Sequence, residues 1–190
     1  MKIDKKTIVL KNDRICLRWL TPADITDEYI IGLNDSEINR YLVDVRRSVQ
    51  TRESVEKFVI FNMNDPACIL FGIFVKDDEK PFVGTIRVHG IDLFHYTANI
   101  GICIFAKRAW KKGYAFQGIR LVNTYLFETL GLHYIEAGAY AKNKNSINAF
   151  GRAGFSEWYR VKNKARLVDS FEEIVYFAAI NSHFDLSRLK

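Results

Sequence analysis

One stretch of the chain, between residues 98 and 130, constrains the fold more than any other because it combines a strand, a basic turn and a long helix. A strand is predicted at residues 98–105, and apolar residues at helical spacing predict a helix at 113–130. Gly113 lets the backbone approach an anion closely, and the unpaired N–H groups of the first helical turn favour negative charge. Residues 110–115 therefore predict a phosphate-binding turn. The P-loop and Rossmann glycine patterns are absent, so the turn alone does not identify the ligand.

The segments around this turn predict a mixed sheet. Runs rich in β-branched and aromatic residues predict strands at residues 15–19, 69–75, 81–90, 133–140, 155–163 and 170–179. Thr21, which precedes Pro22 and Asp24, is typical of a helix start, as is Thr51, and a short helix is expected at residues 146–153. This order of segments predicts the α/β (α+β) class. We expect a single domain over residues 1–190, with its core at about 12–180 and about seven strands flanked by about four helices.

Composition and charge argue against several classes of protein. The apolar runs are far shorter than the roughly 20 residues of a membrane span, and no signal-peptide core is present, so a soluble cytoplasmic protein is expected. Cys16, Cys68 and Cys103 form no CxxC pair and have no histidine at ligand spacing, which predicts neither a disulfide nor a metal site. The net charge of +6 suits acidic metabolites or nucleic acid.

Four motifs around the turn resemble those of the GNAT acetyltransferases. They are Ala98-Asn99-Ile100-Gly101-Ile102-Cys103-Ile104, the run at residues 110–115, Asn143-Lys144-Asn145-Ser146-Ile147 and Gly154-Phe155. The similarity is strongest to the subgroup of ribosomal-protein N-terminal acetyltransferases and amino-sugar acetyltransferases. It implies a GNAT-like sheet that splays between its fourth and fifth strands, residues 98–105 and 133–140, with acetyl-CoA in the gap as acyl donor. The cofactor-binding residues that it implies are Ile102, Cys103, Ile104, Trp110, Lys111, Lys112, Gly113, Tyr114, Ala115, Asn143, Ser146 and Phe150.

The resemblance also shows that two acid/base positions of the family are altered here. The tyrosine that often protonates the leaving thiolate corresponds to Phe150, which has no proton to give. The glutamate that serves as base in some relatives corresponds to Gly138. An oxyanion would be met by a backbone N–H near residues 102–104, as the resemblance implies.

Three side chains are candidates for the missing acid and base. Ser146, or a water held by Asn143, is a candidate proton donor. Glu136 lies two residues before Gly138, on the same face of its strand, and is a candidate base, although a surface charge would have the same pattern. His89 has a side chain suited to base work, but a structural histidine is the more common finding on a strand. No histidine is assigned to activate Cys103, so direct transfer is expected.

The leading hypothesis is an enzyme that moves acetyl from acetyl-CoA to a primary amine of a small molecule, such as a nucleotide-linked amino sugar. Polar residues at positions 34–50 are expected to face this acceptor, with a solvated loop as the alternative. Acetylation of a protein N-terminus, as on a ribosomal protein, is the enzymatic alternative. A nucleic-acid-binding domain and a non-catalytic CoA-binding domain are further alternatives. No membrane partner is expected, and a homodimer is left open.

Overall fold

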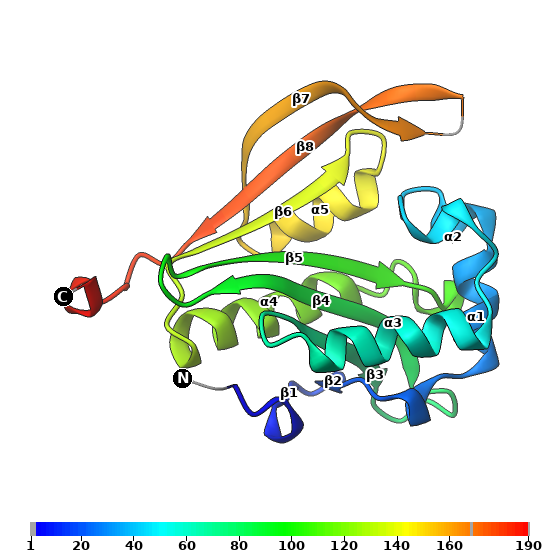
Figure 1. The fold of residues 1–190 in the computed structure, drawn as a ribbon, viewed down its shortest axis with the longest axis horizontal. Helices are drawn as coiled ribbons and strands as arrows, with labels where there is room; N and C mark the ends of the chain where they lie inside the picture. Colours follow the sequence, from blue (N-terminus) through cyan, green and yellow to red (C-terminus); the bar gives the residue numbers. More distant parts are fainter. Residues whose placement is uncertain (1–2, 168, 190) are drawn as a thin grey trace.

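A computed structural model describes residues 3–167 and 169–189 (Figure 1). Within these residues, eight strands form one mixed sheet in the order β1-β2-β3-β4-β5-β6-β8-β7. Neighbouring strands are antiparallel except β5 and β6, which run parallel. The bounds are β1 Val9–Lys11, β2 Ile15–Trp19, β3 Ile69–Val75, β4 Phe82–Asp92, β5 Thr97–Ile104, β6 Tyr134–Tyr140, β7 Ser156–Leu167 and β8 Ser170–Ile180.

Helices cover both faces of this sheet. The α-helices of the described residues are α1 Asp27–Asn34, α2 Ser36–Asn39, α3 Arg52–Asn64, α4 Tyr114–Thr124 and α5 Lys144–Arg152. Asn62 of α3 contacts Arg87 of β4, whereas Gly118 of α4 packs against the preceding residue of that strand, Ile86. Because successive side chains of a strand point to opposite faces, α3 and α4 lie on opposite sides of the sheet. None of the helices in the described ranges is long and apolar enough to cross a membrane.

The predicted α/β class with a mixed sheet is confirmed, but the predicted element counts are slightly low. The strand that was not predicted, β1, pairs only with β2. It has three residues, which is too short to show an alternating pattern. The helix expected to start at Thr21 is divided into a 3₁₀ turn, Pro22–Asp24, and α1. The division falls at Thr26, whose hydroxyl caps α1 by accepting a hydrogen bond from the Tyr29 N–H at 3.2 Å. The fifth helix, α2, has only four residues.

The predicted splay of the sheet is present between β5 and β6. The two strands pair only at Thr97 with Tyr134, Ala98 with Ile135 and Asn99 with Glu136. Beyond this point β5 stays paired with β4, and β6 stays paired with β8 along its whole length. The two strands therefore diverge as a V, which is visible at the centre of Figure 1.

A buried lysine ties the N-terminal segment to the end of α3. The Lys5 ammonium donates hydrogen bonds to the carbonyls of Asn62 at 3.2 Å and Met63 at 3.1 Å, and to that of Asp65. The last carbonyls of a helix lack intrahelical partners, and a cation there also complements the helix dipole. Lys5 therefore fixes the position of the end of α3.

Two helical glycines give opposite expectations for stability. A Cβ added at Gly32 of α1 would lie 2.8 Å from the carbonyl oxygen of Phe105, whereas one added at Gly151 of α5 would meet no atom within 4 Å. Alanine is favoured over glycine in a helix by roughly 0.5–1 kcal/mol, while overpacking costs about 1–3 kcal/mol. We expect Gly32→Ala to lower the free energy of unfolding in urea and Gly151→Ala to raise it. Equal effects of the two substitutions would contradict this packing of α1.

Candidate active site

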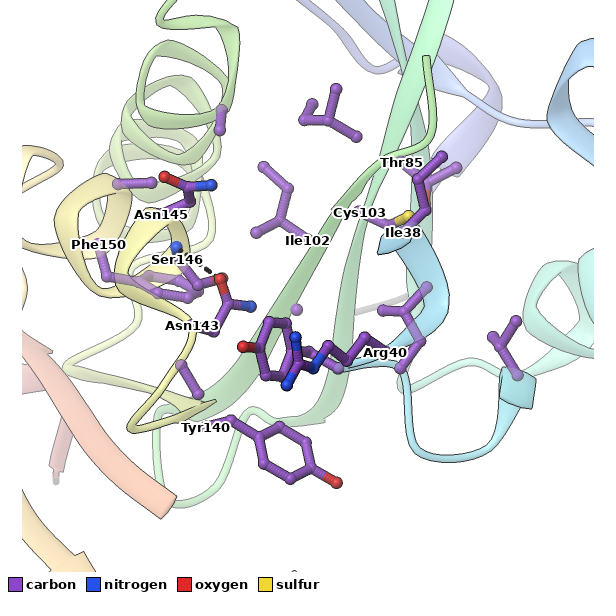
Figure 2. Close-up of a pocket in the computed structure, with 18 of the residues that line it drawn as sticks. Ile38, Arg40, Thr85, Ile102, Cys103, Tyr140, Asn143, Asn145, Ser146 and Phe150 are labelled. Atoms are coloured by element: carbon purple, nitrogen blue, oxygen red, sulfur yellow. Dashed lines mark hydrogen bonds between the residues drawn. The ribbon is translucent and has the colours of Figure 1, made fainter. Parts of the chain in front are cut away.

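A cavity of about 1240 Å³ occupies the gap between β5 and β6. One wall comes from residues 101–104 of β5 and the other from residues 138–140 of β6 and from α5. Figure 2 shows Asn143, Ser146 and Phe150 on one side of this pocket and Thr85 and Cys103 on the other. Ligand pockets usually measure roughly 300–1,000 Å³, so this one has room for a long cofactor together with a second molecule.

The edge of β5 that faces the gap carries free backbone groups. The N–H of Phe105 bonds to the Val83 carbonyl of β4, while the Tyr96 carbonyl accepts bonds from the start of the β6 segment. Backbone groups of alternate residues in a strand point to opposite edges, so the N–H and C=O of Ile102 point into the gap. Trp110 closes the end of this edge, because its indole Nε1 donates to the Ile104 carbonyl at 2.9 Å.

The predicted phosphate-binding turn lies at the open end of the V. Gly113 has φ +82° and precedes α4 without a side-chain cap, and Tyr114 and Ala115, which follow it, also line the pocket. A Cβ at Gly113 would lie 2.9 Å from a ring carbon of Phe116, so a larger residue would fill the cradle. The first N–H groups of α4 are therefore accessible to an anion, as the pyrophosphate of acetyl-CoA requires.

Basic side chains near this turn come from the turn itself and from α5. Lys111 lines the pocket, and so do Lys144 and Arg152 of α5, which the sequence analysis did not select as site residues. The guanidinium of Arg152 lies 3.9 Å from the centre of the Phe116 ring, beside the start of α4. Lys112 is not among the lining residues. Arg152 could not be found from the turn motif because it reaches the turn only through the packing of α5 on α4.

Asn143 and Ser146 are brought together at the start of α5. The Asn143 side chain caps this helix by accepting a hydrogen bond from the Ser146 N–H at 3.2 Å, which leaves the Ser146 hydroxyl outside the cap (Figure 2). Phe150 lines the same wall but is buried, and its ring packs on Phe155 and Phe177. Phe150 therefore serves as part of the core as well as of the pocket wall.

The other two candidate bases lie outside the pocket lining. Glu136 belongs to the last pair before the strands diverge and accepts a hydrogen bond from the Tyr134 hydroxyl at 3.4 Å. His89 pairs with Asn99, also at the closed end of the V. Burial lowers the pKa of His89, and the nearby Arg87 guanidinium lowers it further, so its imidazole is neutral at neutral pH. Their catalytic roles stay predictions.

Two other polar groups in the pocket are poorly suited to proton transfer. Burial raises the pKa of the Cys103 thiol to about 12, so the reactive thiolate does not form at neutral pH. The Tyr140 hydroxyl donates to the Arg166 carbonyl at 3.0 Å and accepts from Arg46 at 3.3 Å, and burial raises its pKa. Both protons are therefore held in place.

The segment after α1 covers part of the pocket. Within residues 37–45, the cavity is lined by Glu37, Ile38 and residues 40–45. The Arg46 guanidinium donates to the Tyr140 hydroxyl and to the Arg166 carbonyl of β7. The rings of Tyr41 and Tyr140 lie 5.5 Å apart. This segment and the β7–β8 hairpin thus form a roof over the pocket.

Comparison with known proteins agrees with this geometry. Residues 14–156 match the family described as the acetyltransferase (GNAT) domain. The "uncharacterized N-acetyltransferase YoaA" of Bacillus subtilis (strain 168) is 28% identical over 149 residues, which cover 78% of this chain and 83% of the relative. The family match spans most of the chain, so the protein belongs to the GNAT acetyltransferases. It is an acetyl-CoA-dependent N-acetyltransferase.

Solved structures show the same fold. A GNAT-family acetyltransferase from Bacillus anthracis has a TM-score of 0.78 at 23% identity, covering 92% of this chain and 99% of that one. Spermidine N-acetyltransferase from Vibrio cholerae, solved with CoA and spermine, has a TM-score of 0.77 at 21% identity, covering 91% of this chain and 99% of that one. These similarities support the fold.

Gly113→Ala should prevent acetyl-CoA binding, because the new methyl group meets Phe116 and the required φ is unfavourable for alanine. Acetyl-CoA at 100 times its dissociation constant should stabilise the unchanged protein by about 2.7 kcal/mol, which thermal unfolding detects. Gly154→Ala is the control, since Gly154 has φ +96° with no atom near the added Cβ. If Gly113→Ala keeps the full stabilisation, the pyrophosphate does not bind at this turn.

Proposed function

We propose that the protein transfers acetyl from acetyl-CoA directly to the primary amine of a small molecule. When bound, acetyl-CoA supplies an acetyl thioester, which is already activated toward an amine. The side chains and backbone groups around Ile102 orient the two reactants and exclude water. Bringing two reactants together in a fixed geometry is itself a large contribution to catalysis.

The observation that carries the choice of a small acceptor is the roof over the pocket. A protein N-terminus needs an open groove along which a chain can lie, whereas a small molecule fits an enclosed site. Arg46 bridges from the segment after α2 to the β7–β8 hairpin, across the path that an extended peptide would take. Acetylation of a protein N-terminus remains the alternative and requires this bridge to open.

The residues of the acceptor side favour a ligand with both flat and anionic parts. The rings of Tyr41, Tyr140 and Tyr176 line this part of the pocket, and Arg40 stacks on Tyr41 at 5.6 Å. Aromatic rings pack well on the apolar faces of sugars, and arginines bind phosphate. These features support a nucleotide-linked amino sugar as one acceptor of the proposed class.

Proton transfer in this proposal uses Ser146, with the Ile102 backbone as the oxyanion donor. The Ile102 N–H points into the gap. It can stabilise the oxyanion without moving, because β4 holds the strand in place. The Ser146 hydroxyl lies on the opposite wall, where it gives its proton to the leaving thiolate and takes up the proton that the attacking amine loses. Cys103 takes no covalent part, because its thiol stays protonated.

Direct transfer predicts that the protein carries no acetyl group between substrates. Incubation with acetyl-CoA and no amine should leave the mass of the intact protein unchanged, while an accepted amine should release free CoA thiol. The control is the same incubation after denaturation of the protein, which reports non-enzymatic acetylation. An acetyl group located on Cys103 by peptide mapping would disprove the direct route.

Ser146→Ala should lower kcat by roughly a hundredfold, the usual contribution of a positioned acid. The cap of α5 should survive, because Asn143 bonds to the backbone N–H of position 146 and not to its hydroxyl. Stabilisation by acetyl-CoA should therefore persist in thermal unfolding. Ser156→Ala, at an exposed position of β7, is the control. Full turnover by Ser146→Ala would assign the proton to another donor.

A further inference from the structure

A second arginine, Arg87 of β4, lines the acceptor side of the pocket. It is opposite Gly101 in the register of β4 and β5, one pair away from Ile102 and two from Cys103. Its side chain is partly buried. Arg87 therefore lies beside the backbone at which acetyl transfer is proposed, on the face of the sheet covered by α3.

The guanidinium is held from one side, by Asn62 and the Cys68 thiol. Arg87 Nε donates to Asn62 Oδ1 at 2.6 Å, and Asn62 is completely buried. The Asn62 amide is itself fixed, since its Nδ2 donates to the Phe58 carbonyl at 2.7 Å and its Oδ1 accepts from the Cys68 thiol at 2.9 Å. Among the described residues, no carboxylate forms an ion pair with Arg87. A guanidinium has five N–H donors, so several remain for another partner beside those that face Asn62 and Cys68.

Two glycines leave open space in this part of the pocket: Gly101, which is paired with Arg87, and Gly138. A Cβ at Gly101 would meet no atom within 4 Å, and one at Gly138 would meet its nearest atoms, on Ile174 and Tyr176, only at 3.6 Å. Gly138 also lines the pocket, on the strand across the gap from Gly101. The wall beside Arg87 is therefore formed by backbone, which leaves room for an acceptor molecule.

The other charges on this side do not neutralise Arg87. The acidic lining residues are Glu37 and Asp44, and their side chains are 65% and 88% exposed and paired with Lys107 and Arg47. The remaining charged residues on this side are basic: Arg40, Lys142 and Lys164. Lys142 is paired with Glu172 at 2.7 Å. A cationic acceptor such as a polyamine would meet a predominantly positive pocket.

We infer that Arg87 binds an oxyanion, a carboxylate or a phosphate, carried by the acceptor amine. This inference rests on the proposed function and adds the chemical class of its substrate. A guanidinium presents two parallel N–H donors that match either oxyanion, and a partly buried site strengthens the pairing. Binding the anion at Arg87 places the rest of the acceptor over Gly101, next to the acetyl group. Arg87 is thus a specificity-determining residue.

Matched pairs of amines test this inference by release of CoA thiol. One pair is β-alanine and its amide, which differ in a carboxylate; the other is glucosamine 6-phosphate and glucosamine, which differ in a phosphate. The anionic member of at least one pair should have the higher kcat/KM, by roughly tenfold to a hundredfold, as expected for a charge-assisted hydrogen bond. The pair that responds tells whether a carboxylate or a phosphate is recognised. Spermidine serves as the cationic comparison.

Arg87→Gln should remove this preference, mainly by raising the KM of the anionic amine. Arg87→Lys should restore only part of it, since a single ammonium lacks the paired donors. Arg120→Gln, at an exposed position of α4, is the control.

A preference for spermidine or for the neutral amines would overturn the inference. An anionic preference that survives in Arg87→Gln would also overturn it. So would loss of acetyl-CoA stabilisation in Arg87→Gln, because Arg87 would then belong to the cofactor site. Failure of the unchanged protein to bind acetyl-CoA would instead overturn the proposed function.

Discussion

The site depends on one interrupted ladder of hydrogen bonds, that between the parallel strands β5 and β6. Three residue pairs close the ladder at one end, and then β4 holds β5 while β8 holds β6. Unpaired backbone groups inside a protein are costly unless a partner satisfies them. Trp110 satisfies the Ile104 carbonyl, and the groups of Ile102 are left to whatever fills the gap. The gap can therefore bind a ligand, because the strands on its two sides leave backbone groups without a partner in the sheet.

Features set by local chemistry were predictable from the sequence. Gly113 indicated a turn at the start of a helix, and the structure places it at φ +82° before α4. Thr51 indicated a helix start, and its hydroxyl accepts a hydrogen bond from the Ser54 N–H at the start of α3. Such signals depend on neighbours within one helical turn, so they need no knowledge of the fold. The motifs near the turn then limited the fold to one family.

Features set by contacts between distant segments were not predictable. Arg87 reads in the sequence as an ordinary polar residue of a strand, because nothing nearby shows that Asn62 will hold its Nε or that Gly101 will leave space beside it. Arg152 reads as the end of a short helix, and only the packing of α5 places it beside Phe116. Glu136 and His89 have suitable chemistry, but the register puts both at the closed end of the V. Residue type alone therefore does not show which half of a strand lines the pocket.

Lys5, near the start of the chain, is connected through hydrogen bonds to Arg87 in the pocket. Lys5 bonds to the Asn62 carbonyl, and the Asn62 side chain bonds to Arg87, so three residues from separate segments form a continuous relay. A change in the first residues can therefore shift the guanidinium without altering any residue that a substrate touches. Substitution of Lys5 would then alter which acceptors this protein selects, even though the lining of the pocket stays the same.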